Sequence, residues 1–402
     1  MTILYASPSV SFLADLLGVR LHTWRRLHRA AGWMTCAQTG FHIIFNLTGS
    51  QSILLRERGT VFGIIASASL LLVMLLPLPI IRRFIYPVFY SSHYLLAISV
   101  IYATWMHMLR GSSASWYLTY PILGTFGTTF LFEICITLYR NGAFGSCWSK
   151  GVTERRDDSS LRIEMAPGRP VVVLPGQYFN LWVPSLNPWS WFHVSSFTVT
   201  SLSVDKQHRL QFLAKRPNRS IGFTWLLTKS RRHLTFFSGP HGLSEPAPRY
   251  ETVLLIASDA GMLAIKPETR RLCLAWHVSG QQMGMNLMTE MAGWINRLIY
   301  YNEEDKIHML QTMVFDPKRL IGLIPGESGT RGRISRDSPN FNDILGNEVE
   351  GHRQRLVEDV KAERGKILVI ISASDEVRDD LQQSAKGYLR WVRIVDLDYQ
   401  PA

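Results

Sequence analysis

The sequence is poor in cysteine and in charged side chains. Its four cysteines are scattered over 402 residues, at Cys36, Cys135, Cys147 and Cys273. This wide spacing excludes a disulfide-stabilised scaffold and a cysteine-rich zinc site. Charged residues make up 18% of the chain and hydrophobic residues 47%, which excludes a disordered, coiled-coil or collagen-like chain. The length predicts two or three domains.

The net charge of +12 is unevenly distributed. Residues 1–150 hold 11 Lys or Arg and 3 Asp or Glu, so they contribute +8 of the total. The basic residues in this half lie between apolar stretches, which is typical of the positive-inside bias of membrane proteins. We therefore expect a lipid bilayer as partner and no nucleic acid.

Apolar stretches long enough to cross a bilayer fill the first third of the chain. Four of them lack Asp, Glu, Lys and Arg, at 30–55, 59–81, 84–109 and 111–132, and about 20 residues suffice for one crossing. They predict a transmembrane domain over residues 1–145 with helices at 30–50, 61–81, 86–108 and 117–139. No signal peptide is evident at the N-terminus.

The basic residues between these stretches predict the orientation. One set of connections carries eight of them, namely Arg20, Arg25, Arg26, Arg29, Arg82, Arg83, Arg140 and Lys150. The opposite connections carry Arg56, Arg58 and Arg110. The N-terminus and everything after Arg140 should therefore be cytosolic.

Four histidines in the apolar stretches repeat one spacing. His28 and His42 are fourteen residues apart, as are His93 and His107. Fourteen residues make about four helical turns, so each pair would share a helix face over about 21 Å. Facing pairs of His28 with His93 and His42 with His107 would suit bis-imidazole ligation of two haems, one toward each membrane surface. The alternative is that these are polar residues near the headgroups.

The two histidine-bearing segments resemble a known family. HTWRRLHRAAGWMTCAQTGFH and RRFIYPVFYSSHYLLAISVIYATWMH are similar to the haem helices of fungal ferric reductases, in the superfamily that includes NADPH oxidases. The resemblance implies two b-type haems with axial ligands His28, His42, His93 and His107. Family members usually have one or two further helices before the first haem helix, so we expect an N-terminally short chain.

After Gly151 the pattern changes to short alternating apolar and polar runs. LRIEM, SSFTVTSL and HRLQFLAKR predict strands of an antiparallel barrel. From Tyr250, strands such as TVLLIAS and KILVIISAS alternate with helices, which predicts a parallel α/β sheet. The polar segment 326–355 is expected to be an exposed excursion. This order resembles the ferredoxin-reductase-like module, which implies a flavin barrel over 150–245 and an NAD(P)-binding domain over 246–402.

Short motifs carry the resemblance to the flavin barrel. Pro175–Tyr178 reads PGQY and resembles the strand that leads into the flavin site of that family. Ser196–Val199 stands where the family has its His-Pro-Phe-Thr/Ser motif, with serines in place of His-Pro. The resemblance implies FAD-binding residues at Phe197, Thr198, Val199, Gly222, Phe223 and Thr224. The alternative for Phe197 and Thr198 is an ordinary strand with a buried phenylalanine.

The nucleotide motifs depart further from the family. Gly239 and Gly242 belong to a GPHG loop that resembles the family's Gly-Pro-Tyr-Gly. Ser258–Met262 replaces Gly-Gly-x-Gly-Ile and keeps Gly261 alone, while the following crossover looks shortened. The resemblance implies NADPH contacts at Gly239, Gly242, Gly261 and Ser374. The alternative is that this edge no longer binds NADPH.

Three hypotheses for function follow. The first is a multi-pass protein, expected in the plasma membrane, that passes electrons from cytosolic NADPH through FAD and two haems to extracytosolic ferric or cupric ions or chelates. The second is a superoxide-generating, NADPH oxidase-like enzyme. The third is a truncated or decayed paralogue that binds haem without NADPH-dependent activity. The sequence indicates no catalytic side chain, acceptor metal or oligomeric state.

Overall fold

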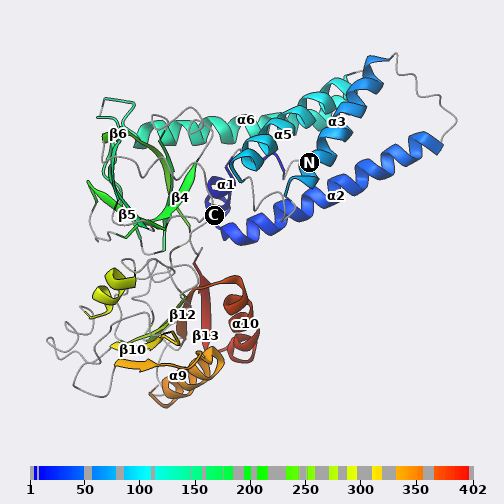
Figure 1. Cartoon of the computed structure of the whole chain (residues 1–402). Coiled ribbons are helices and arrows are strands. Elements are labelled where there is room, and N and C mark those ends of the chain that lie inside the picture. The colour runs from blue at the N-terminus through cyan, green and yellow to red at the C-terminus, as the bar shows by residue number, and fades with distance from the viewer. Residues whose placement is uncertain are drawn as a thin grey trace. The chain divides into compact units, whose positions relative to one another are not determined.

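The structure, a computed structural model, divides into two compact units (Figure 1). The first comprises residues 1–144, 182–194 and 217–225, and the second comprises 145–181, 195–216 and 226–402. The described residues are 4–6, 9–48, 57–77, 86–109, 114–145, 147–155, 160–174, 176–183, 194–200, 206–215, 232–242, 244, 250, 252–258, 271–278, 288–296, 310–318, 332–355 and 366–397.

The first unit is built from helices. Its elements are α1 (Val10–Leu16), α2 (Leu21–Thr48), α3 (Arg58–Leu75), α5 (Tyr86–Met108) and α6 (Ala114–Arg140). Ser9 caps α1 by accepting a hydrogen bond from the Phe12 amide at 3.2 Å, which satisfies a donor at the start of the helix. By these bounds, each of the four apolar stretches lies largely within one of the helices α2, α3, α5 and α6.

Two of these helices are long and apolar enough to cross a membrane. They are α3, over Arg58–Leu75, and the Tyr120–Arg140 part of α6. Within the described residues, α2 and α5 are not apolar enough over a membrane-spanning length to count as candidate spans by the same test. Both carry the histidines of interest, and α2 also carries arginines at its start. The count of four spans therefore stays a prediction.

The N-terminal residues pack on the helices of this unit. The Tyr5 hydroxyl donates to the Ala97 carbonyl of α5 at 3.4 Å, and the Thr129 hydroxyl of α6 donates to the Ala6 carbonyl at 2.6 Å. These bonds tie the beginning of the chain to two helices.

The second unit begins with a closed antiparallel barrel. Its strands are β1 (Lys150–Arg155), β2 (Ser160–Ala166), β3 (Tyr178–Trp182), β4 (Ser195–Thr198), β5 (Leu210–Lys215), β6 (Arg232–Leu234) and β7 (Phe236–His241). They form two sheets in the orders β5-β2-β1-β6 and β4-β3-β7. β6 runs on into β7, and a bridge between Val199 and Phe212 joins β4 to β5. These two links close the barrel formed by the described strands.

Aromatic rings fill the barrel. The ring of Phe179 lies 5.8 Å from that of Phe212 and 5.5 Å from that of Phe237, between centroids. Phe197 joins this cluster at 6.4 Å from Phe212. Because strand side chains alternate between faces, the neighbours of Phe179 and Phe197 lie on the outer face.

The rest of the unit is a parallel sheet. Its strands are β8 (Thr252–Ser258), β9 (Arg271–His277), β10 (Leu310–Phe315), β11 (Gly332–Ser335), β12 (Ile367–Ser372) and β13 (Val392–Asp396). The order is β11-β10-β9-β8-β12-β13, and all pairings are parallel. The strand order reverses between β8 and β12, which is where doubly wound sheets bind ligands. This confirms the predicted antiparallel barrel and α/β fold.

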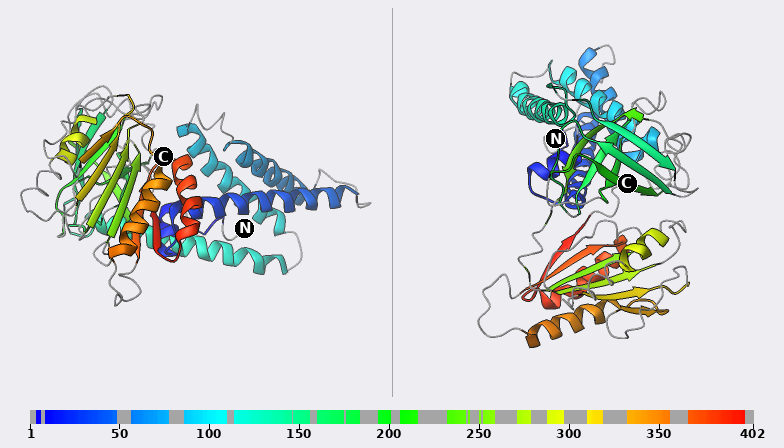
Figure 2. Two further views of the ribbon diagram at one scale, coloured as in Figure 1. Left: turned by 90° about the horizontal axis from the view of Figure 1, so that it is seen from below. Right: turned by 90° about the vertical axis from the view of Figure 1, so that its left-hand side faces the viewer.

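Helices cover both faces of the sheet (Figure 2). Val253 and Leu255 of β8 belong to a cluster with Met291, from the helical residues 288–296. Leu254 and Ile256, which alternate with them, belong to a cluster on the opposite face. The sheet is therefore buried on both sides, as the unbroken apolar run of β8 requires.

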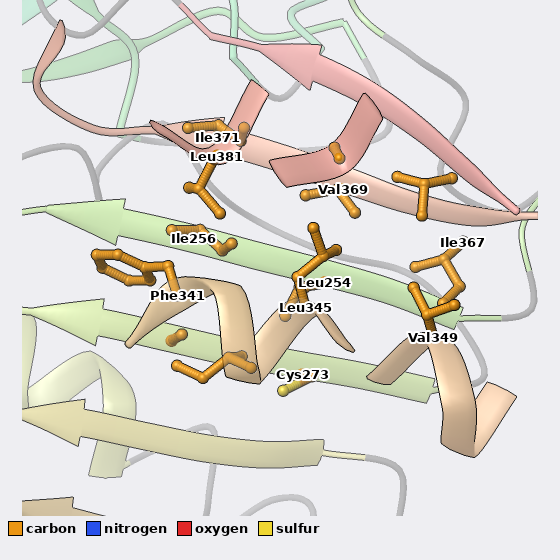
Figure 3. Close-up of a cluster of buried hydrophobic side chains, with 14 of the residues drawn as sticks. Leu254, Ile256, Cys273, Phe341, Leu345, Val349, Ile367, Val369, Ile371 and Leu381 are labelled. Carbon is orange, nitrogen blue, oxygen red and sulfur yellow. The ribbon is translucent and has the colours of Figure 1, made fainter. Parts of the chain in front are cut away.

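The expectation of an exposed excursion at 326–355 is wrong for residues 332–355, while residues 326–331 lie outside the described part of the chain. Residues 332–335 form β11, and α9 (Phe341–Arg355) follows it. Phe341, Leu345 and Val349 point from α9 onto Leu254 and its neighbours (Figure 3). Their spacing of four residues places them on one helix face. The many polar and glycine residues among which these side chains stand in the sequence hid this apolar stripe.

Candidate functional site

The four histidines lie in two facing pairs in the helical unit. His28 and His42 both belong to α2, and His93 and His107 both belong to α5. The rings of His28 and His93 have centroids 6.3 Å apart, and those of His42 and His107 have centroids 6.4 Å apart. The structure thus brings together the same partners that the spacing predicts.

This ring spacing fits an iron held between two imidazoles. A metal–imidazole nitrogen bond is about 2 Å long and a ring centre lies about 1 Å behind its nitrogen, so ligating rings have centres about 6 Å apart. Both pairs match that value. A haem iron needs only two axial ligands from the protein. This is compatible with the described residues, which contain no group of three or more His, Cys, Asp or Glu placed for a metal ion.

Polar groups accompany the second pair. The Nδ1 atom of His107 lies 2.8 Å from the carbonyl oxygen of Gly59 on α3. The Asn46 amide donates to the His42 carbonyl at 2.7 Å and lies 3.4 Å from both ring nitrogens of His42. Sequence reasoning missed Gly59 and Asn46, because neither carries a side chain of the expected ligand type.

The PGQY segment of the barrel is tied to the GPHG loop. The Gln177 side chain donates to the Gly242 carbonyl at 3.3 Å and accepts from the Leu174 amide at 2.9 Å. Gly242 has a positive φ of 98°, and Gly239 has one of 125° with Tyr178 and Phe179 packed against it. Glycine alone adopts these conformations readily. The two motifs therefore form one connected end of the barrel.

Phe197 and Thr198 lie on opposite faces of β4. Phe197 is 7% exposed and belongs to the aromatic cluster inside the barrel. Thr198 pairs with Tyr178, and Ser196 pairs with Asn180, on the other face. Val199 is buried and bridges to Phe212. On the face opposite the Phe197 ring, Ser196 and Asn180 are partly exposed, whereas Thr198 is buried.

A chain of polar side chains crosses this outer face. The Ser196 hydroxyl donates to Asn180 at 2.6 Å, and the Asn180 amide donates to the Ser238 hydroxyl at 3.4 Å. A hydrogen bond of 2.9 Å links Ser238 to the Nε2 atom of His241. Sequence reasoning missed Asn180, Ser238 and His241 as a set because they come from separate strands, although each lies near a recognised motif.

The edge of the parallel sheet where the resemblance implies NADPH contacts carries a hydrogen bond between two serines. The backbone amide of Ser374, which precedes α10 (Asp375–Ala385), donates to the Ser258 hydroxyl at 3.0 Å. This bond crosses the point between β8 and β12 where the strand order reverses. The predicted residues Gly222, Phe223, Thr224 and Gly261 lie outside the described residues, as does Pro175.

Comparison with known proteins supports the assignment of the helical unit. Residues 1–104 match the family described as ferric reductase like transmembrane component. The chain is also 26% identical, over 191 residues, to ferric/cupric reductase transmembrane component 2 of Saccharomyces cerevisiae. That match covers 46% of this chain and 25% of the yeast protein, so the chain spans about a quarter of that relative.

Solved structures are similar to this chain over about three fifths of its length. One is a ferredoxin NADP+ reductase from Neisseria gonorrhoeae with bound FAD and NADP, at 11% identity and a TM-score of 0.42, covering 62% of this chain and 98% of that one. Another is the CS-b5R part of human Ncb5or in its NAD+ form, at 13% identity and a TM-score of 0.39, covering 61% and 68%. The closed barrel and the strand order themselves define the ferredoxin-reductase-like fold of this unit. The chain therefore joins a helical region that matches the ferric reductase like transmembrane component family over residues 1–104 to a barrel and a parallel sheet with a ferredoxin-reductase-like fold.

Proposed function

We propose that this chain is a transmembrane reductase that moves electrons from cytosolic NADPH to ferric or cupric ions across the membrane. Its resident cofactors would be FAD and two b-type haems. When bound, FAD would accept a hydride and the haems would carry single electrons. The protein would hold these carriers in order, with the plasma membrane as the expected location.

The observation that carries this proposal is that four histidines of α2 and α5 lie in two facing pairs. Intramembrane ionisable side chains are costly and are usually functional. Here two helices each supply two of them, at ring spacings of 6.3 and 6.4 Å that suit an iron atom. His28 and His93 would hold the haem on the cytosolic side, and His42 and His107 the outer haem. Fourteen residues of helix place the two sites about 21 Å apart, so together they would relay electrons across the hydrocarbon core.

The outer face of the barrel supports the flavin part of the proposal. Thr198, Ser196 and Asn180 carry hydroxyl and amide groups on one face, where Ser196 and Asn180 are partly exposed and Thr198 is buried. Such groups would orient the polar edge of a flavin ring, and the adjoining loop with Gly239 and Gly242 would lie toward the nicotinamide. Phe197 would support this face from inside the barrel.

A second candidate is a haem-binding protein that does not accept hydride from NADPH. The observation that favours it is the contact between Ser258 and Ser374. Ser258 stands where the family has the first glycine of its phosphate-binding turn, and its side chain already engages the backbone across the switch point. A ligand at that edge would have to displace this bond.

A difference spectrum of detergent-purified protein separates the two candidates. The reduced-minus-oxidised spectrum is taken after NADPH is added under anaerobic conditions and again after dithionite. Two low-spin haems reduced by NADPH alone would support the reductase. Haems reduced by dithionite alone would support the second candidate, and superoxide formed on admitting air without ferric reduction would instead indicate an oxidase.

A further inference from the structure

His107 is seated against α3 at two points one helical turn apart. Its Nδ1 atom lies 2.8 Å from the Gly59 carbonyl oxygen. A Cβ atom at Gly63 would lie 3.0 Å from Nδ1 and 3.1 Å from Cε1 of the same ring. Contacts this short require the ring to shift by a few tenths of an ångström, so the imidazole occupies space that only a glycine leaves open.

The packing of α3 on α5 brings the ring to this position. Gly59 and Gly63 have the small-xxx-small spacing that lets membrane helices approach closely. Further along the same interface, the hydroxyls of Ser69 and Ser99 lie 3.0 Å apart. The rings of Phe62 and Tyr102 are in edge contact at 6.1 Å between centroids. The seat of His107 is thus part of a continuous helix–helix contact.

The bond to Gly59 determines which ring nitrogen carries the proton. A carbonyl oxygen can only accept a hydrogen bond, so the neutral His107 ring must carry its proton on Nδ1 and keep Nε2 unprotonated. The same ring faces His42 on α2, with centroids 6.4 Å apart. A metal-ligating histidine typically donates its second ring N–H to such a carbonyl, which fixes its orientation and raises its basicity.

We propose that Gly59 and Gly63 form a seat on α3 that fixes the tautomer and position of His107 as the axial ligand of the outer haem. This inference rests on the proposed haem-binding function. Gly59 acts through its carbonyl and Gly63 through its missing side chain, so both are positioning residues. A stronger imidazole donor stabilises the ferric form, and the seat therefore lowers the midpoint potential of the outer haem.

The test compares Gly63→Ala with Gly40→Ala in the full-length, detergent-purified chain. Gly40 lies on α2, and no atom of the described residues comes within 4 Å of the position that a Cβ would take, so its substitution is the matched control. Haem per chain and the midpoint potential of each haem are measured by optical redox titration. We expect Gly63→Ala to raise one of two potentials while the other stays as in the unsubstituted chain, and Gly40→Ala to change neither.

Two results would overturn the inference, and a third would overturn the proposed function on which it rests. Two haems with unchanged potentials in Gly63→Ala would show that the seat does not act on His107. If Gly63→Ala does not accumulate, 15N chemical shifts of the histidine-labelled, unsubstituted chain decide: a proton on Nδ1 of His107 supports the seat, and one on Nε2 overturns it. Absence of haem from the unsubstituted chain would instead defeat the proposed function.

Discussion

Ser374 donates its backbone amide to the Ser258 hydroxyl at 3.0 Å, across the reversal point of the parallel sheet. Ser258 ends β8 and is buried, whereas Ser374 is exposed at the start of α10. This contact links residues that are 116 positions apart. Ser258 stands at the position where the resemblance to ferredoxin reductases implies the first glycine of a turn.

Removing the Ser258 hydroxyl should destabilise the sheet slightly. Ser258→Ala takes away the acceptor of the Ser374 amide, and we expect a loss of about 1 kcal/mol, the usual net worth of one hydrogen bond. Thermal unfolding of the purified chain measures it. Ser374→Ala is the control, because the Ser374 side chain makes no capping hydrogen bond to α10. Equal stability of both variants would show that the contact contributes nothing.

Truncating the apolar face of α9 should be far more costly. Leu345 is buried in the cluster of Figure 3, so Leu345→Ala should cost about 2–5 kcal/mol through lost burial and a residual cavity. Asn347→Ala, at an exposed position of the same helix, should stay within about 0.5 kcal/mol. Denaturant titration followed by fluorescence compares them. A neutral Leu345→Ala would mean that α9 does not pack on the sheet.

The Thr198 hydroxyl should matter for flavin retention. Thr198→Val keeps the shape of the side chain and removes one hydrogen-bonding group, so we expect FAD to bind roughly tenfold more weakly, the equivalent of about 1.4 kcal/mol. Titration of the flavin-depleted chain with FAD, followed by flavin fluorescence, gives the affinity.

Thr153→Val is the matched control for this experiment. Thr153 lies on β1 of the same barrel, and its buried hydroxyl has no hydrogen-bond partner within the described part of the chain. Its replacement should leave FAD affinity unchanged. A Thr198→Val chain that binds FAD as tightly as this control would remove Thr198 from the flavin site.

Much of the architecture follows from local pattern. The spacing of fourteen residues predicts which histidines share a helix, and α2 and α5 are each continuous through both members of a pair. The alternating runs after Gly151 predict the barrel, and the buried runs after Tyr250 predict the parallel sheet. In each case the periodicity of side chains along one element carries the information.

Other features depend on contacts that no local pattern encodes. The bond from Ser374 to Ser258 and the seat of His107 on Gly59 join distant segments, so the sequence alone does not reveal them. The face of Phe197 depends on the register of β4 with β3. The helix α9 is different, since the spacing of Phe341, Leu345 and Val349 was a readable signal that the polar composition of the segment obscured.

The haem-to-chain ratio tests the central claim most directly. Haem is extracted from the purified chain as its pyridine complex and compared with protein concentration, for the unsubstituted chain, His28→Ala, His42→Ala and His22→Ala. His22 also lies on α2 but belongs to neither pair. We predict two haems in the unsubstituted chain and in His22→Ala, and one in each of the other variants. A chain without haem, or a ratio that does not change when His28 or His42 is replaced, would contradict the account.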